Sequence, residues 1–396
     1  MLLALVASGV ADGFLPVALS FAVLRVTGST GRLGLVLATQ SILGLLLTLA
    51  GGLAGDRFAR KRVLTASLSA RLAVAVVLAA TLLTGSASFA LLIVMSGIYG
   101  CADGFYGPAS TAMLPEVVPR DQLARANALV GGSTSALRVA APGAAGVVVA
   151  GLGTGAAFVV QAAILATAVG CLAVVRPSAG PRPAEARSPG PLAQLRAGWK
   201  EFVRIRWLWL LTSQWTAFSL IVLSPLAVLG PAIALRDLGG PASWGLINSC
   251  LAFGAIGGQV VAGRITAPRR PALVVVCLVP VIAGEALALG LGASLAVVAL
   301  ATVGAGAAFG FQTVLFATAM QTAVQPAMLS RVAAIDLLGS EGGQPVGYAL
   351  AGPIGAAAGA HLVLVTGAVV MFAGSVAFAF LPSLRAQIPG DPWQPT

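Results

Sequence analysis

The sequence predicts an all-α membrane protein with twelve transmembrane helices in two six-helix halves. Three observations predict this class: the composition, the length of the apolar stretches and an internal repeat. Of the 396 residues, 58% are hydrophobic and only 9% are charged, whereas an ordinary soluble domain has roughly 25% charged residues. A water-soluble enzyme and a disordered chain are therefore excluded.

Twelve stretches are apolar and long enough for a helix that crosses a bilayer, which takes about 20 residues. We place them at about 1–24, 33–55, 63–84, 88–112, 122–149, 153–175, 207–233, 243–263, 271–291, 293–319, 330–357 and 360–381. No basic segment precedes the first stretch, so we expect it to be a membrane span and not a cleaved signal peptide.

The chain divides into four parts at its polar segments. Residues 176–191 are polar and rich in proline, and the following sixteen residues, LAQLRAGWKEFVRIRW, have a basic and an apolar face at helical spacing. This pattern predicts an amphipathic helix on the cytoplasmic membrane surface. The predicted parts are an N-terminal half (1–175), a cytoplasmic linker (176–206), a C-terminal half (207–381) and a cytoplasmic tail (382–396).

The basic residues gather on one side of the predicted membrane. Eighteen of the 23 Lys and Arg residues fall in one set of loops and tails, three fall in the other set, and two lie inside spans. Basic loops remain on the cytoplasmic side of a membrane. We therefore expect both termini to be cytoplasmic, and the net charge of +11 needs no nucleic-acid partner.

The two halves are similar to each other at an offset near 206 residues. Span 4 continues as GFYGPASTAMLPE from Gly104, and span 10 continues as GFQTVLFATAMQT from Gly310. Because each copy has six spans, both copies have the same orientation in the membrane. Secondary transporters are built from such parallel repeats and bind substrate between them. Channels can also be duplicated, so the repeat alone does not decide the function.

Some ionisable residues lie well inside predicted spans, where a charge is costly and marks a candidate functional residue. They are Asp12, Arg71, Asp103, Arg138, Glu285, Asp336 and Glu341. Arg71 is about two turns from a basic loop, so we expect it to snorkel to the cytoplasmic face. Asp336 is close enough to Arg331 to form a structural ion pair. Glu341 lies deeper, among glycines, and is either structural or part of a site.

Uncharged polar and aromatic side chains are scattered through the spans. Those that we select as candidate substrate-binding residues are Tyr99, Tyr106, Trp215 and Gln312. With few charges, such a cavity suits an amphiphilic molecule better than a sugar.

The segment GLAGDRFARKRVL, from Gly52 to Leu64, resembles the signature of the loop between spans 2 and 3 in the major facilitator superfamily. Two further segments resemble the branch of enterobactin exporters and macrolide-efflux proteins. They are GVADGFLPVAL in span 1 and LPEVVPRDQLARANAL after span 4. The resemblance covers the whole chain and implies the major facilitator fold.

The resemblance also implies a gate in this loop. In the family, the acidic residue of the loop meets the N-terminus of span 11, where a partial positive charge favours an anion. The gating candidates are Gly52, Asp56, Arg57, Arg60 and Lys61. The alternative is that these basic residues fix the topology and nothing more.

Spans 1 and 4 line the cavity in this family. The resemblance therefore makes Asp12 and Asp103 the candidates for proton coupling in the N-terminal half, with Arg138 as their partner and Glu341 as a further candidate. Asp12 is alternatively a structural hydrogen-bonding residue. Glu285 is on a span that packs outside the cavity in the family, and it is either structurally paired or an outlier.

Span 5 contains part of the family's antiporter motif. The family's GPxxGG is APGAAG here, with Pro142, Gly143 and Gly146 retained as structural residues. Small residues allow span 5 to pack closely against its neighbour, so packing alone explains most of this motif.

These features together predict a secondary active transporter of the bacterial inner membrane. We expect proton-coupled export of an amphiphilic drug or siderophore by alternating access, as in antiporters that cause multidrug resistance; the alternative is an importer or uniporter of a small metabolite. No Walker A, GxSxG or HExxH motif is present, and the four Cys residues and the one His form no metal-binding spacing. We therefore expect no enzyme activity, no cofactor other than the proton gradient, no metal, and a monomer in the lipid bilayer.

Overall fold

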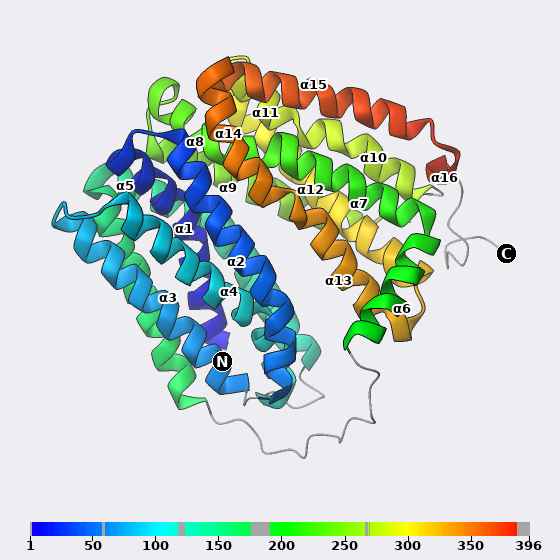
Figure 1. The fold of residues 1–396 in the computed structure, drawn as a ribbon, viewed down its shortest axis with the longest axis horizontal. Coiled ribbons are helices and arrows are strands. Elements are labelled where there is room, and N and C mark those ends of the chain that lie inside the picture. The colour runs from blue at the N-terminus through cyan, green and yellow to red at the C-terminus, as the bar shows by residue number, and fades with distance from the viewer. Residues whose placement is uncertain are drawn as a thin grey trace. The chain divides into compact units, whose positions relative to one another are not determined.

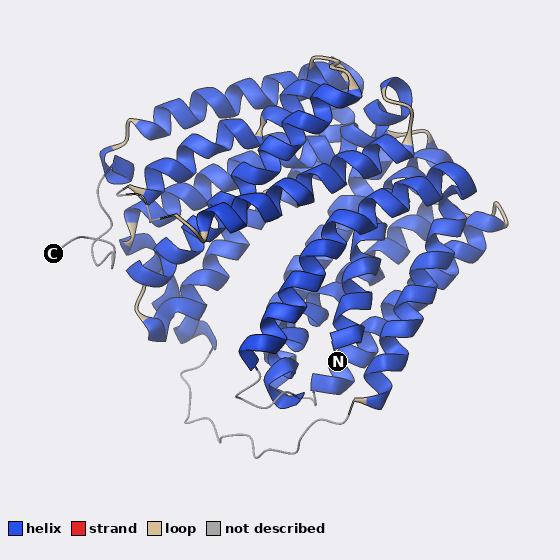
Figure 2. Ribbon diagram, turned by 180° about the vertical axis from the view of Figure 1, so that it is seen from behind, coloured by secondary structure: helices blue, strands red, loops and turns tan. Residues whose placement is uncertain are grey.

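The computed structural model describes residues 2–57, 60–117, 123–175, 191–265, 268 and 270–385. Figure 2 shows that these residues form helices joined by loops. The all-α class predicted from composition is therefore confirmed. The sixteen residues that follow the polar linker are described, and residues 176–190 of the linker lie outside the described residues.

The helices follow one another along the described parts of the chain (Figure 1). In the first half they are α1 (Leu2–Thr27), α2 (Thr30–Arg57), α3 (Arg60–Leu83), α4 (Phe89–Val117) and α5 (Leu123–Val174). They continue as α6 (Pro191–Arg204), α7 (Arg206–Phe218), the π-helix η2 (Ser219–Leu223), α8 (Ser224–Asp237) and α9 (Pro241–Ala262). The last ones are α10 (Pro271–Ile282), α11 (Gly284–Gly290), α12 (Leu295–Ala323), α13 (Pro326–Gly342), α14 (Gln344–Ala358), α15 (Ala360–Ala379) and α16 (Pro382–Arg385).

Among the described residues, ten helical segments are long and apolar enough to cross a membrane. One of them, α5, contains two of the predicted spans, which are separated at Gly153, where φ is 85°. This left-handed conformation favours glycine because a Cβ atom would clash with the backbone. The predicted span 330–357 corresponds to α13 and α14, which are too short to be counted singly. The twelve predicted spans therefore all have helical counterparts.

The surface of the protein is unusually apolar, and one charged side chain is fully buried. Leu300, Phe253 and Phe372 are 74%, 63% and 57% exposed, whereas the charged side chain of Arg71 is 0% exposed. Large exposed apolar patches on soluble proteins are rare. Lipid contact accounts for the exposed side chains, and polar partners must account for the buried arginine.

The chain forms two compact units, each with its own core. One unit comprises residues 1–182, 227–249 and 348–357, and the other comprises residues 183–226, 250–347 and 358–396. In the first unit α1 packs on α5, α2 on α4, and α3 on both α4 and α5. In the second unit α10 packs on α12 and α15. The four-part division predicted from the sequence remains a prediction.

Helix α6 occupies the predicted amphipathic segment. Phe202 is buried, and Gly198 lies against the side chains of Arg331 and Ile335 on α13. Trp199 is 58% exposed on another face. The side-chain hydrogen bond donated by Arg204 lowers the pKa of Glu201 on this helix, outside the membrane-spanning segments. The apolar face of α6 is therefore used, at least in part, for packing on α13.

Glycines bring pairs of helices into backbone contact in both halves. In the first unit, a Cβ atom on Gly104 of α4 would lie 2.6 Å from the carbonyl oxygen of Gly44 on α2. In the second unit, Gly310 of α12, which is equivalent by the repeat, faces the backbone of Ala255 on α9. Close approach through small residues replaces hydrophobic burial as the means of helix association in lipid. A glycine in close contact with a neighbouring helix backbone therefore occurs at matching positions of the two copies.

The small residues of span 5 also lie at a close helix contact. Within the first unit, a Cβ atom on Gly146 of α5 would lie 2.6 Å from the carbonyl oxygen of Pro241 and 3.0 Å from the Cα of Gly245, both on α9. A Cβ atom on Gly143 would lie 2.8 Å from the Oγ of Ser249. Close packing on α9 therefore explains why positions 143 and 146 have no side chain larger than that of glycine.

Helices of the second half are interrupted, whereas α1 to α4 are continuous over their lengths. The π-helix η2 lies between α7 and α8, Ala283 separates α10 from α11, and Gly343 separates α13 from α14. Prolines at 231, 280 and 353 lie inside these helices. A proline removes a backbone hydrogen bond and a π-turn adds a residue, so each changes the helix direction locally.

The glycine contacts lead to a prediction with an internal control in each copy. Gly104→Ala and Gly310→Ala should each destabilise the protein by about 1–3 kcal/mol, because the added methyl group meets backbone atoms that cannot move independently. On Gly107 of α4 and Gly304 of α12 an added Cβ atom meets no described residue within 4 Å, so Gly107→Ala and Gly304→Ala should leave stability unchanged or raise it. Thermal unfolding of the four variants in detergent measures the difference. Equal melting temperatures within each pair would contradict the close-packing account.

Candidate functional site

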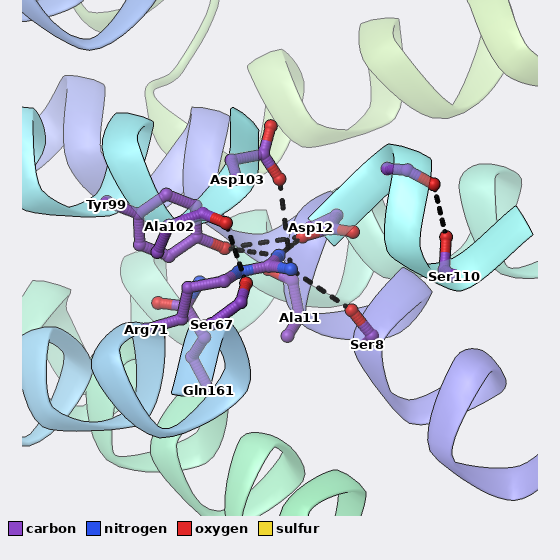
Figure 3. Close-up of polar contacts among 11 residues, drawn as sticks. Ser8, Ala11, Asp12, Ser67, Arg71, Tyr99, Ala102, Asp103, Ser110 and Gln161 are labelled. Atoms are coloured by element: carbon purple, nitrogen blue, oxygen red, sulfur yellow. Dashed lines mark hydrogen bonds and ion pairs between the residues drawn. The ribbon is translucent and has the colours of Figure 1, made fainter. Parts of the chain in front are cut away.

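A buried arginine lies at the centre of the helices α1, α3 and α4. Arg71 of α3 has 0% exposed surface. Helix α1 presents Ser8 and Asp12 to it, and α4 presents Tyr99 and Asp103 (Figure 3). Each of these pairs is separated by four residues, which places both members on one helix face.

Polar contacts surround the Arg71 guanidinium. Its Nη1 donates to the Oγ of Ser8 at 3.2 Å, and its Nη2 donates to the hydroxyl of Tyr99 at 2.7 Å. Nη2 forms an ion pair with Oδ1 of Asp12, and Nη1 lies 3.8 Å from Oδ1 of Asp103. The Tyr99 hydroxyl in turn donates to Asp12 Oδ1 at 3.3 Å. The two carboxyl groups are therefore joined through one cation.

The charges of this cluster do not balance when both acids are ionised. The guanidinium remains protonated at every physiological pH, so the cluster has one fixed positive charge and up to two negative charges. The side chains of Asp12 and Asp103 are 43% and 55% exposed, whereas Arg71 is closed off. One proton on either acid would neutralise the cluster. The arrangement is thus chemically able to take up and release a proton at an accessible carboxyl.

The prediction that Arg71 snorkels to the membrane face is wrong. Its position along the sequence, two turns from a basic loop, did not reveal that it points into the bundle. The polar spacing of α1 and α4 was the available signal, because Ser8 and Asp12, like Tyr99 and Asp103, repeat at helical spacing. The predicted partner Arg138 has a side chain outside the described residues, so the described partner of both acids is Arg71.

Two predicted substrate-binding residues belong to the surroundings of Arg71. The guanidinium carbon lies 4.8 Å from the ring centroid of Tyr99 and 5.1 Å from that of Tyr106. An aromatic face attracts a cation, and more strongly when water is excluded. Tyr99 is 3% exposed, so in this structure its hydroxyl group serves the arginine.

The predicted gating residues are described in part. Gly52, Asp56 and Arg57 end α2 and Arg60 begins α3, but their side chains lie outside the described residues. The Nζ of Lys61 donates to the carbonyl oxygens of Ala173 at 2.8 Å and Val175 at 2.6 Å. These carbonyls end α5, where a cation offsets the negative end of the helix dipole. Lys61 therefore caps a helix here, and a gate at Asp56 remains a prediction.

The second unit contains a cavity of about 310 Å³. Helices α7, α10, α12 and α13 line it, and two predicted substrate-binding residues, Trp215 and Gln312, are part of its wall. Trp215 stacks on Phe309 with ring centroids 5.6 Å apart. Both Asp336 and Glu341 of α13 also line it. The volume is within the usual range for small-molecule sites.

The prediction that Asp336 pairs with Arg331 is wrong. Asp336 instead accepts a hydrogen bond of 2.5 Å from the Thr212 hydroxyl. Arg331 contacts the sulfur of Met328. Glu341 accepts a hydrogen bond from the Gln344 side chain. Although five residues separate Asp336 from Glu341 along α13, both residues line the cavity.

Glu285 belongs neither to the Arg71 cluster nor to the wall of the cavity. It begins α11, is 4% exposed, and has no hydrogen bond or ion pair with any residue that the structure describes. The expectation of a structural ion pair is thus not met within the described chain. No group of three or more His, Cys, Asp or Glu side chains in the described parts could hold a metal ion.

The sequence profile described as "Major Facilitator Superfamily" matches residues 1–347. The chain belongs to the major facilitator superfamily. The predicted fold of two six-helix halves is thereby confirmed for this facilitator. No curated protein sequence matches it.

Solved structures of transporters have the same fold as this facilitator. A bacterial homologue of the human lysosomal transporter Spinster, in an inward-facing and unoccupied conformation, has a TM-score of 0.71 at 15% identity and covers 100% of this chain and 98% of its own. The nucleoside transporter NupG has a TM-score of 0.77 at 12% identity, over 96% of this chain and 98% of its own. A bacterial homologue of the iron transporter ferroportin has 0.71 at 14% identity, over the same shares. At such identities the likeness concerns the fold.

The Arg71 cluster predicts strong energetic coupling between Arg71 and Asp12. Arg71→Gln leaves Asp12 without its cation, so adding Asp12→Asn should recover part of the lost stability. We expect a coupling energy of about 1–3 kcal/mol from a double-mutant cycle followed by thermal unfolding. The control pair is Arg204 and Glu201 on α6, where Arg204 is 65% exposed. Exposed pairs contribute little, so additive effects at both pairs would contradict the account of the cluster.

The cap made by Lys61 predicts a local effect. Lys61→Met should let the last turn of α5 open more often, and its amides should exchange about two- to fivefold faster, since a cation at a helix C-terminus contributes about 0.3–1 kcal/mol. Hydrogen exchange read by mass spectrometry on the peptide that ends near Val175 measures this. Arg62→Met, on the exposed neighbour, is the matched control. Unchanged exchange in Lys61→Met would show that the cap has no effect on stability.

Proposed function

We propose that this chain is a secondary active transporter that exports an amphiphilic small molecule in exchange for protons by alternating access. The observation that carries the proposal is the Arg71 cluster: one permanent cation shared by two partly accessible carboxyl groups inside the membrane. The resemblance of span 1 and of the segment after span 4 to enterobactin exporters and macrolide-efflux proteins supports export. The basic loops support a bacterial inner membrane location with both termini cytoplasmic.

The two acids have different tasks in this proposal. Asp12 is in direct ion contact with Arg71 and also accepts from Tyr99, so its charge is well compensated. Asp103 is 3.8 Å from the guanidinium and is the more exposed of the two. We assign the exchangeable proton to Asp103. When Asp103 is protonated, Arg71 is balanced by Asp12 alone, and when Asp103 loses its proton it competes for the guanidinium.

Substrate binding in this proposal belongs to the cavity of the second unit. Its walls combine aromatic rings with a few polar groups, as small-molecule sites do. Its carboxyl groups are held by neutral partners, Thr212 and Gln344. Proton and substrate would thus use different parts of the chain. An importer or uniporter could use the same cavity, so direction has to be measured.

The direction and the coupling can be tested in everted membrane vesicles. With an imposed proton gradient, vesicles containing the transporter should accumulate at least one member of a panel made of a macrolide, a catechol siderophore and a naphthylalkyl amine. Asp103→Asn should reduce this accumulation to the level seen without a gradient, because the neutral amide cannot exchange a proton. Asp12→Asn should have the same effect and also lower stability. Glu201→Gln, on α6 outside the membrane-spanning segments, is the control and should behave as wild type.

Two results would reject the proposal. Accumulation of the panel compound in intact cells that express the transporter would show import. Gradient-driven accumulation that persists in both Asp103→Asn and Asp12→Asn, at equal protein levels, would place proton coupling elsewhere.

A further inference from the structure

The cavity of the second unit is lined by acceptors of hydrogen bonds without a balancing cation. Asp336 and Glu341 supply two carboxyl groups, and none of the described residues that line the cavity is Lys, Arg or His. Each carboxyl is oriented by a neutral donor, the hydroxyl of Thr212 and the side-chain amide of Gln344. These hydrogen bonds fix the position of the acids but add no positive charge. The uncompensated carboxyl groups therefore favour a positively charged ligand in this cavity.

Gln312 gives an independent indication of what the guest must offer. Its side chain lines the cavity and is 9% exposed, yet its Oε1 atom has no hydrogen-bond partner among the described residues. A buried carbonyl oxygen without a donor is unfavourable and rare. A ligand with an N–H group would supply the missing donor. The Oε1 atom of Gln312 and the two carboxyl groups all accept hydrogen bonds, so a ligand with N–H donors matches all three.

The remaining wall suits the apolar part of such a ligand. Trp215 and Phe309 stack at an interplanar angle of 22°, and Phe316 and Met320 also line the cavity. A cation next to aromatic faces gains electrostatic energy in addition to apolar contact. Methionine adapts its shape to ligands of varied outline. A flat, apolar body with a cationic end matches both parts of the wall.

We propose that the cavity binds an organic cation of the arylalkyl-ammonium class. Its N–H groups donate to Glu341, Asp336 and the Oε1 of Gln312, and its aromatic body lies against Trp215 and Phe309. This inference rests on the proposed function, since it names the substrate class of the exporter. An anionic substrate such as a free carboxylate is excluded by the same two acids, and a neutral one leaves their charge without a partner.

Binding to the purified, full-length transporter in detergent tests the proposal without a gradient. The probes are three compounds with one naphthylbutyl skeleton that ends in an ammonium, a hydroxyl or a carboxylate group. Near neutral pH the ammonium should bind at least about tenfold more tightly than the alcohol, since a charge-assisted hydrogen bond is worth more than a neutral one. The carboxylate should bind more weakly than both. Isothermal titration gives the three dissociation constants.

Substitutions of residues that line the cavity test whether the selectivity for the ammonium compound arises there. Glu341→Gln should weaken ammonium binding by about tenfold or more and leave the alcohol almost unaffected. The matched control is Glu285→Gln, which changes a buried carboxyl of the same unit that does not line the cavity, and it should leave the three constants unchanged. Alcohol binding to Glu341→Gln also shows that the variant is folded. Gln312→Leu should weaken the ammonium more than the alcohol.

The results that overturn the inference differ from those that overturn the proposed function. Equal affinity for ammonium and alcohol, tighter binding of the carboxylate, or an unchanged ammonium constant in Glu341→Gln would each reject cation recognition. None of these measurements depends on transport direction or on a proton gradient. A transporter that binds the ammonium with this selectivity but fails the vesicle assay would retain the cation site and lose the export proposal.

Discussion

A guanidinium that cannot lose its proton is buried among the helices of the first half, and the polar chemistry of that half is organised around it. Arg71 requires a counter-charge, and Asp12 and Asp103 provide one more than is needed. Ser8 and Tyr99 accept hydrogen bonds from its Nη1 and Nη2 atoms. It requires a cover against lipid, and two tyrosine rings contribute to it. Replacing Arg71 by an apolar residue would leave the carboxyl groups of Asp12 and Asp103 without this counter-charge inside the membrane, which is energetically costly.

The fold was readable from the sequence because a bilayer imposes a simple rule on composition and length. Every backbone group must be satisfied within the span, so apolar stretches of sufficient length become helices. The interruptions were harder to foresee. The π-turn of η2 and the break at Gly343 depend on which neighbour each segment meets, and a single sequence does not contain that information.

The site residues were predicted with mixed success, for reasons that differ by residue. Asp12 and Asp103 could be selected because a charge in a span is rare, and the structure brings both to one arginine. The fate of Arg71 was missed because distance along a helix does not say which way a side chain points. Asp336 was assigned to the wrong partner because proximity in sequence to Arg331 outweighed Thr212, which is over a hundred residues away. Contacts across helices decide such cases.

The glycine-to-backbone contacts of α2 with α4 and of α9 with α12 have a mechanical consequence. Where the side chains of two helices interdigitate, one helix can move past the other only if each side chain leaves the groove in which it packs. Gly104 and Gly310 have no side chain that could pack into such a groove. At these two positions no side chain on Gly104 or Gly310 opposes a shift along the helix axis, and the helices stay close together.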